Sequence, residues 1–420
     1  MSKPGKAAER LLSGRAWDDY CDQLRQTGHM IEQFGDSVTE LDRTEWYRFL
    51  TRYARMGFEH YVECSEPTRP RFHDMTWRQT INFTSPLQDH FFADFEDGSA
   101  DYVITGNKGT MPYFVIASLG FDGPPNYAER DWAPLGVAGL KEFNTALLKT
   151  QGAIESGAIT FDADGNFRVI VSQTNPEDGS DWLRSTPDST MLLCRAVYAK
   201  RDGTKPATMT IQRFDKAPYR PIDAAFLSGA LAKAAQMTLA YAELARSWWQ
   251  DNLSTRPNSV NFSEALYLSN GGVQDDRFHG FGAWEKASDE TLIVRFKPID
   301  CDFWTFQFCN IWQENFDNYE EGQGYVYKDG VTLESDGSVT MVVADSDLGI
   351  GGTWIDPYSH SHGGWSFRLI KTRGKPPPPV ETWLVKTADL QRDGLVATIT
   401  NIAPLKSGGV TDWGIAPDPD

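Results

Sequence analysis

A short segment near the C-terminal end contains the residues best suited to acid–base chemistry. Asp356, His360 and His362 follow Trp354 there. Histidine transfers protons near neutral pH, and a neighbouring carboxylate fixes its tautomer. We therefore predict that His360 is a general acid or base oriented by Asp356. The alternatives are a polar loop without chemistry and a metal site, because a His-x-His pair with an aspartate can bind a divalent ion.

A second candidate is the ring-rich segment 303–327, in which Glu314 and Asp317 follow several aromatic residues. Such a segment can line an apolar pocket with a carboxylate at its mouth, so Glu314 is predicted as the second catalytic carboxylate. The alternative is a strand buried on both sides in a core. The residues predicted to contact a substrate are Trp304, Trp312, Trp354, Tyr358, His362 and Arg368.

The sequence pattern around these residues occurs twice in the chain. An Asp-Gly pair, a tryptophan, an arginine and a proline recur at nearly the same spacing, which indicates a duplicated β module. The first set is Asp164-Gly165, Trp182, Arg195 and Pro206, and the second is Asp336-Gly337, Trp354, Arg368 and Pro379. Recurring positions are predicted to be scaffold. The first copy has no histidine where the second has His360, so we expect the chemistry in the second module.

The pattern of short segments rich in β-branched and aromatic residues, separated by turn residues, predicts a mainly β fold. We expect two tandem antiparallel β-sandwich or jelly-roll-like modules, with an N-terminal helical segment and a helical connector. The predicted boundaries are 1–76 for the helical segment, 77–221 for the first module, 222–266 for the connector, 267–403 for the second module and 404–420 for a tail.

Apolar residues at helical spacing predict helices within 7–65 and over 222–251. Asp42 is a plausible N-cap, because Glu45 follows it at the spacing of a capping box. We expect the helices within 7–65 to cover a sheet, with a helical dimer surface as the alternative. We expect the helix over 222–251 to be a connector packed in the groove between the two modules.

Composition excludes several classes of function. The formal net charge of -18 opposes binding to nucleic acid or to an anionic membrane. Five scattered cysteines indicate a reducing compartment, and no apolar run long enough to span a membrane and no secretory leader are present. We therefore expect a cytoplasmic protein without membrane insertion. Phosphate-loop, dinucleotide, zinc-helix and nucleophile-elbow motifs are absent, so no cofactor and no metal ligand are predicted.

Several of these residues resemble motifs of a bacterial family known by its domain of unknown function 1214, whose relatives often also carry domain of unknown function 1254. The matches in the first half are the helical segment Asp42–Tyr53 and the segment Gly98–Gly106. Those in the second half are Trp312, Glu314, Asp317, Asp336-Gly337, Asp347–Asp356, His360 and Arg368. The chain departs from the family pattern at Ser85–Gln88, Asp181, Thr353 and Ser359. The resemblance implies a jelly-roll-like fold that forms homo-oligomers, and it implies no particular reaction.

Together these patterns predict an enzyme for a bulky, largely apolar small molecule such as a terpenoid, steroid or aromatic metabolite. Its reaction would be hydrolysis, elimination or hydration, the chemistry of a hydrolase or lyase, with His360, Asp356 and Glu314 as catalytic groups. The alternative is a non-catalytic β-sandwich protein that binds a carbohydrate or lipid, and a third possibility is a structural component of an oligomer.

Overall fold

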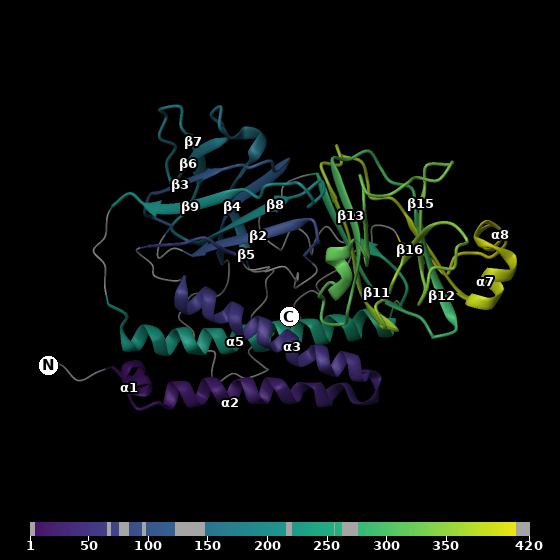
Figure 1. Ribbon diagram of the computed structural model, residues 1–420. Coiled ribbons are helices and arrows are strands. Elements are labelled where there is room, and N and C mark those ends of the chain that lie inside the picture. Colours follow the sequence, from purple (N-terminus) through teal and green to yellow (C-terminus); the bar gives the residue numbers. More distant parts are fainter. Residues whose placement is uncertain are drawn as a thin grey trace, which may run out of the picture.

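The computed structural model describes residues 5–64, 69–74, 84–94, 98–121, 148–215, 221–255, 257–262 and 276–408. Within these ranges the fold is mainly β, and two β modules stand side by side on a layer of helices (Figure 1). The longest helix, α5 (Ala224–Thr255), runs beneath both modules. None of the helices in these ranges combines the length and apolar character needed to cross a membrane.

The predicted N-terminal helical segment is present. Its elements are α1 (Lys6–Leu12), α2 (Arg15–His29), the 3₁₀ segment η1 (Met30–Ser37), α3 (Glu40–Phe58) and the π-helical turn η2 (Glu59–Glu63). Buried Trp46, Phe49 and Tyr53 of α3 form a core with Met237 of α5.

The predicted helix cap at Asp42 is wrong, because α3 begins three residues earlier. Thr39 is the N-cap, and its hydroxyl accepts a hydrogen bond from the Asp42 N–H. The Asp42 carboxylate accepts from the Thr39 N–H at 2.7 Å, which completes a capping box. Asp42 therefore lies inside the helix, with its side chain buried.

The first module has two sheets. One contains, in order, β1 (His73–Asp74), β2 (Gln88–Asp94), β8 (Ser189–Val197), β4 (Tyr113–Phe121) and β5 (Leu148–Glu155). The other contains β7 (Asp181–Arg184), β6 (Asn166–Ser172), β3 (Tyr102–Asn107) and β9 (Thr208–Arg213). Side chains of both sheets share one core, to which Ile104 of β3 and Phe114 of β4 contribute.

The second module repeats this plan. One sheet contains β10 (Asn261–Phe262), β11 (Arg277–Glu285), β17 (His362–Ile370), β13 (Phe303–Cys309) and β14 (Tyr325–Tyr327). The other contains β16 (Thr353–Ile355), β15 (Val339–Val343), β12 (Glu290–Phe296), β18 (Val380–Lys386) and β19 (Lys406–Gly408). Val294 of β12 and Phe306 of β13 belong to its common core.

The same strand order occurs in both modules. The orders β2-β8-β4-β5 and β7-β6-β3-β9 match β11-β17-β13-β14 and β16-β15-β12-β18. The prediction of purely antiparallel sheets is wrong, because β6 pairs with β7, and β15 with β16, in parallel. In both modules a loop returns the chain to the starting end of the first strand of the pair (β6 or β15). The second strand (β7 or β16) therefore runs in the same direction as the first. The recurring tryptophan lies in that second strand.

Some predicted boundaries lie outside the described residues, namely the module starts at 77 and 267 and most of the tail from 404. Strands in the described residues near these boundaries show that both modules extend beyond their predicted limits. Strand β1 precedes residue 77, β10 lies within the predicted connector, and β19 lies within the predicted tail and pairs with β18. Two short helices that the sequence patterns did not predict follow β18, α7 (Thr387–Asp393) and α8 (Leu395–Asn401).

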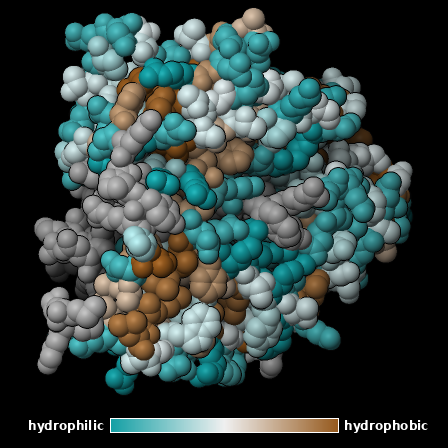
Figure 2. Space-filling model, turned by 60° about the vertical axis from the view of Figure 1, so that its left-hand side comes forward, coloured by the Kyte–Doolittle hydropathy of each residue, from teal (hydrophilic) through white to brown (hydrophobic). Residues whose placement is uncertain are grey.

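Hydrophobic surface gathers in the lower part of one face of the molecule, at the level of the helices (Figure 2). Exposed large apolar side chains include Leu12 and Trp17 in α1 and α2 and Ile222 just before α5. Contiguous apolar surface of this kind is more typical of contact surfaces than scattered single residues are.

Candidate metal centre

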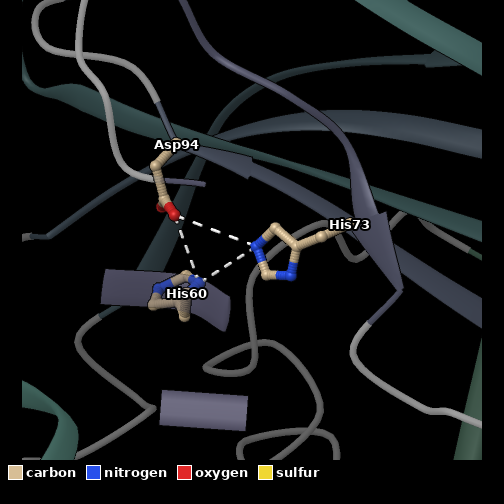
Figure 3. Close-up of side chains that lie close together, drawn as sticks. All are labelled: His60, His73 and Asp94. Atoms are coloured by element: carbon tan, nitrogen blue, oxygen red, sulfur yellow. Dashed lines mark hydrogen bonds and ion pairs between the residues drawn. The ribbon is translucent and has the colours of Figure 1, made fainter. Parts of the chain in front are cut away.

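Three segments far apart in the sequence meet beside the first module and bring His60, His73 and Asp94 together (Figure 3). His60 lies in η2, His73 in β1, and Asp94 is the last residue of β2. His73 lies opposite Phe92 in the β1–β2 pair. Because alternate residues of a strand point to the same face, Asp94 projects on the side that carries His73.

The helix that leads to His60 is held close to α5. A Cβ atom on Gly57 would lie 3.0 Å from the carbonyl oxygen of Ala234, so only glycine allows this approach without movement. The π-helical turn η2 begins just after, at Glu59. Single π turns of this kind are frequent at functional sites because they redirect a side chain. Here the turn places His60 against the end of β2.

The separations of the three donor atoms suit one metal ion. His60 Nδ1 lies 3.2 Å from Asp94 Oδ2 and 3.3 Å from His73 Nε2, and His73 Nε2 lies 4.0 Å from Asp94 Oδ2. Two ligands at about 2.1 Å from an ion lie about 3.0–3.4 Å apart at right or tetrahedral angles. Two of the three separations meet this condition, and the third needs a small side-chain movement.

The protonation states also suit a cation. Burial lowers the pKa of His60 and His73 to about 4, so both rings are neutral and can donate a lone pair at pH 7. Burial raises the pKa of Asp94 to about 7, although His73 and Lys233 oppose the shift. Asp94 Oδ2 is buried and makes no hydrogen bond. A divalent ion would compensate this carboxylate, which two neutral imidazoles cannot do.

One side of the cluster is formed by apolar side chains, and the charge of Lys233 also acts on His60 and Asp94. The Phe92 ring centre lies 6.4 Å from the ring centre of His60 and 6.3 Å from that of His73. Met191 lies opposite Asp94 across the β2–β8 pair, and buried Leu193 and Leu119 belong to the same cluster as Phe92. The side chains of His60 and His73 are 7 % exposed and that of Asp94 is 20 % exposed. The site is thus nearly dry, and the carboxylate is its most accessible ligand.

Sequence reasoning missed these three residues because no local motif contains them. They stand at positions 60, 73 and 94, on a helical turn and two strands, and only the pairing of β1 with β2 brings them together. The available signal was weak, since three of the seven histidines lie within 60–90.

The predicted catalytic histidine lies in a different place, where α3 meets the second module. His360 is buried; its Nδ1 lies 2.9 Å from the carbonyl oxygen of Pro357, and its Nε2 lies 3.0 Å from Glu45 Oε2. Burial disfavours the imidazolium, but the hydrogen bond and charge of Glu45 outweigh it and raise the pKa of His360. His362 Nε2 lies 2.9 Å from Asp42 Oδ2 in the same network.

Asp356 does not take the predicted role of orienting His360, because Glu45 and the Pro357 carbonyl group occupy both ring nitrogens. One Asp356 oxygen instead accepts a hydrogen bond from the Tyr358 N–H at 2.8 Å, and the other lies 3.4 Å from Asn318 Nδ2. The Asp356 side chain therefore shapes its own loop.

Glu314 joins the network from the second module. It is fully buried and forms an ion pair with Arg52 of α3, and Asn310 Nδ2 donates to its other oxygen at 3.2 Å. Burial raises the pKa of Glu314, and the charge of Arg52 opposes the shift. Trp312 Nε1 donates to the Asp42 carbonyl oxygen at 2.9 Å. Four predicted residues, His360, His362, Glu314 and Trp312, are therefore brought together, as contacts that hold α3 against the second module.

The remaining predicted residues do not join this group. Trp304 belongs to the core of the second module, and Tyr358 is 41 % exposed. Arg368 lies opposite His279 in the β11–β17 pair. Trp354 Nε1 donates to the Ala344 carbonyl oxygen at 2.8 Å, and the recurring Trp182 likewise donates to that of Ser172 at 3.1 Å.

Three donor atoms of Asp42, Glu45 and His360 also lie within reach of a single ion. These groups already have strong partners, since His360 contacts Glu45, His362 contacts Asp42, and Arg48 lies 3.0 Å from Glu45. The cluster of His60, His73 and Asp94 leaves a carboxylate oxygen without a hydrogen bond, and it is the better candidate for a metal.

Comparison with solved structures finds a crystal structure of an uncharacterized protein from Burkholderia cenocepacia, with 28 % identity and a TM-score of 0.78. The match covers 91 % of this chain and 100 % of that one. The VPA0106 protein from Vibrio parahaemolyticus matches at 10 % identity and a TM-score of 0.43, over 81 % of this chain and 98 % of that one. No family model and no curated protein matches this chain.

Proposed function

We propose that the chain is an enzyme whose reaction takes place at one divalent metal ion held by His60, His73 and Asp94. The observation that carries the proposal is the convergence of two neutral imidazole nitrogens on a buried carboxylate oxygen that makes no hydrogen bond. Two histidines and one carboxylate leave coordination positions open for water and substrate, as in catalytic zinc and non-haem iron sites.

The metal would supply Lewis acidity and lower the pKa of a bound water molecule, which serves hydrolysis or hydration. The chain's own residues would hold the ion, and the ring of Phe92 with the neighbouring Met191 and Leu193 would limit the access of bulk water. The same side chains favour a largely apolar substrate, such as a terpenoid, steroid or aromatic metabolite.

A comparison of variants on a mixture of small molecules tests this function. Metal-loaded wild type and His73→Ala are incubated with an extract of apolar metabolites, and substrate loss and product gain are followed by mass spectrometry. We expect products that form only with the wild type: either one product that equals a substrate plus water, for hydration, or two fragments that together equal a substrate plus water, for hydrolysis. Equal conversion by both proteins would exclude this metal centre as the site of reaction.

Acid–base catalysis at His360 remains a second hypothesis that the same mixture can test. Its burial and its bonds to Glu45 and Pro357 favour a structural role. If His360→Gln abolished turnover while the protein stayed folded and metal-loaded, catalysis would have to be assigned to the network of α3 and the second module.

Three further features belong to this proposal. Each pair of sheets with a common core would form a β-sandwich of jelly-roll type, and the chain would be related to the family with domain of unknown function 1214. The apolar surface over the helices supports a homo-oligomer (Figure 2). The five free thiols support a cytoplasmic location.

A further inference from the structure

The contact between α3 and the second module contains a histidine that needs a proton on both ring nitrogens. His360 Nδ1 lies 2.9 Å from the Pro357 carbonyl oxygen, and His360 Nε2 lies 3.0 Å from Glu45 Oε2. Both oxygens only accept hydrogen bonds, so the imidazolium satisfies both contacts, whereas a neutral ring has a single N–H. Loss of the proton therefore leaves a buried nitrogen lone pair facing an oxygen. The Phe316 ring limits escape, because it stacks on His360 with ring centres 4.7 Å apart.

The loop that carries His360 is strained just before the histidine. Tyr358 and Ser359 have φ of +52° and +66°, in the left-handed region that residues with side chains seldom adopt. Such conformations persist only where the surrounding contacts hold them. Here the His360 ring is bound on one side of α3, and His362 Nε2 lies 2.9 Å from Asp42 Oδ2 of the same helix. Without the contact to Glu45, the loop can relax away from α3.

Helix α3 connects this contact to the candidate metal centre. Phe58 and Glu59 have helical φ and ψ, so α3 continues without a break into η2, which carries His60. His60 follows Glu45 by 15 residues, or about 22 Å of helix. Glu45 contacts the second module and His60 contacts Asp94 of the first, and α3 runs beneath both (Figure 1). A displacement of α3 at Glu45 is therefore transmitted to His60.

The cations around His360 in the described elements are each paired with a carboxylate, so none of them replaces its proton. The negative charges of Glu45 and Asp42 favour the imidazolium. The other titratable groups of the network are His362 and Glu314. The remaining charged groups that pack here are Arg48 and Arg52 of α3, which pair with Asp317 and Glu314, Asp356 of the loop, and Glu285, Lys286 and its partner Asp345 beside the 361–362 segment.

We propose that a pH-sensitive switch holds α3: protonated His360 binds Glu45 and keeps His60 at the metal centre, and loss of the proton releases α3 and loosens the bound ion. This regulation rests on the proposed metal-dependent function. Burial lowers the pKa of His360, but the hydrogen bond and charge of Glu45 outweigh burial and raise it. The switch is therefore closed below this raised pKa and opens as pH rises through it.

The rate of Zn²⁺ release from the zinc-loaded full chain to excess EDTA, at pH 6 and pH 9, tests the switch. The comparison is with Glu45→Gln, whose amide can accept from the imidazolium or donate to the neutral ring and so keeps the contact at both pH values. Relative to this variant, the wild type should release zinc about tenfold faster at pH 9 than at pH 6, the factor expected for loss of a hydrogen bond to a charged group. Comparing the two proteins at each pH cancels the effects of pH on EDTA and on the other titratable groups.

Two further variants control this comparison. Glu32→Gln removes the carboxylate of an exposed pair, in which His29 Nδ1 lies 3.1 Å from Glu32 Oε1, and should behave as the wild type. His360→Gln replaces the ring by an amide that does not titrate, and it should behave as Glu45→Gln. It takes the place of Glu45→Gln if thermal melting shows that variant to be unfolded.

Hydrogen exchange of residues 40–58 in the metal-free chain, corrected for the intrinsic effect of pH on amide exchange, tests the switch independently of zinc. We expect α3 of the wild type to lose protection at pH 9 relative to Glu45→Gln, with similar protection at pH 6. The same pH dependence in both proteins, in zinc release or in hydrogen exchange, would overturn the inference. A wild type that binds no zinc would instead contradict the proposed function, and the exchange of α3 would then decide alone whether the switch exists.

Discussion

At the scale of single residues, the two histidine–carboxylate clusters differ in how their charges are compensated. In the network of α3 and the second module, Glu45 contacts His360 and Arg48, and Glu314 contacts Arg52. In the candidate metal centre, the Asp94 oxygen that faces both imidazoles makes no hydrogen bond. The carboxylates of the first cluster have strong partners, whereas Asp94 of the second has an oxygen without a hydrogen bond that a bound cation would compensate.

The Arg52–Glu314 pair gives a prediction for stability. Arg52→Ala should lower the free energy of unfolding by about 3–5 kcal/mol, because it leaves the carboxylate of fully buried Glu314 without its counter-charge. The double variant Arg52→Met with Glu314→Leu should recover most of this loss, since apolar side chains of similar size can replace a buried pair. Urea unfolding measures both. A double variant as unstable as the single one would contradict this explanation.

His360 gives a prediction for pH. Its pKa in the folded protein is raised by Glu45, so the protonated ring contributes its full stabilisation below the unfolded value of about 6.5. The contribution is lost as pH rises through the folded pKa. The stability advantage of the wild type over His360→Gln should therefore be larger at pH 6 than at pH 9. Urea unfolding at both values measures it, and NMR titration should place the pKa of His360 above 6.5. A larger advantage at pH 9 would contradict the assignment.

At the scale of elements, the recurring tryptophans close the loops that return the chain for parallel pairing. Trp182 and Trp354 each donate to a carbonyl group ten residues earlier. Replacing either by phenylalanine keeps most of the ring and removes one indole N–H donor, which in Trp182 is shared between the carbonyl oxygen and the hydroxyl of Ser172. Each change should therefore lower stability by about 1 kcal/mol. Thermal and urea unfolding of the two variants should give similar losses, without loss of bound metal. If Trp354→Phe lost turnover and Trp182→Phe did not, Trp354 would have to be assigned to a substrate-binding site, as the sequence predicted.

Helices and turns could be predicted where the sequence pattern was long or occurred twice. The helix over 222–251 is α5, and the recurring Asp-Gly turns have glycines at φ of +84° and +83°, at Gly165 and Gly337. The cap of α3 was misplaced because Asp42 and Glu45 have capping-box spacing, while Thr39 competes for the same role. Parallel pairing was missed because a strand's residues do not encode the direction of its neighbour.

At the scale of the whole molecule, the candidate metal centre lies beside only one of the two repeated modules. His90 and His279 lie opposite the recurring Arg195 and Arg368, which aligns β2 with β11. In this alignment, Asn261 of β10 takes the place of His73, and Ala283 takes that of Asp94. At these two described positions the second module has neither the histidine nor the aspartate of the metal centre. The expectation that only the second module carries chemistry is replaced by the proposal that the first one does.

The location of the site could not be predicted from the sequence for a physical reason. His360 and Asp356 are close in sequence, and proximity in the chain suggested proximity in space. The fold instead gives the two side chains different partners, with His360 contacting Glu45 across 315 positions and Asp356 contacting Tyr358 and Asn318. The cluster of His60, His73 and Asp94 likewise depends on tertiary pairing alone, which spacing along the chain does not reveal.

Metal stoichiometry measured by mass spectrometry tests the central proposal most directly. The purified chain is incubated with excess Zn²⁺ or, without oxygen, Fe²⁺, and desalted before counting. We predict one tightly held ion per chain in the wild type and none in His73→Ala or Asp94→Asn. The control His29→Ala, which removes an exposed histidine of α2, should keep its ion. Full metal content in the two ligand variants, or a folded wild type without metal, would contradict the account.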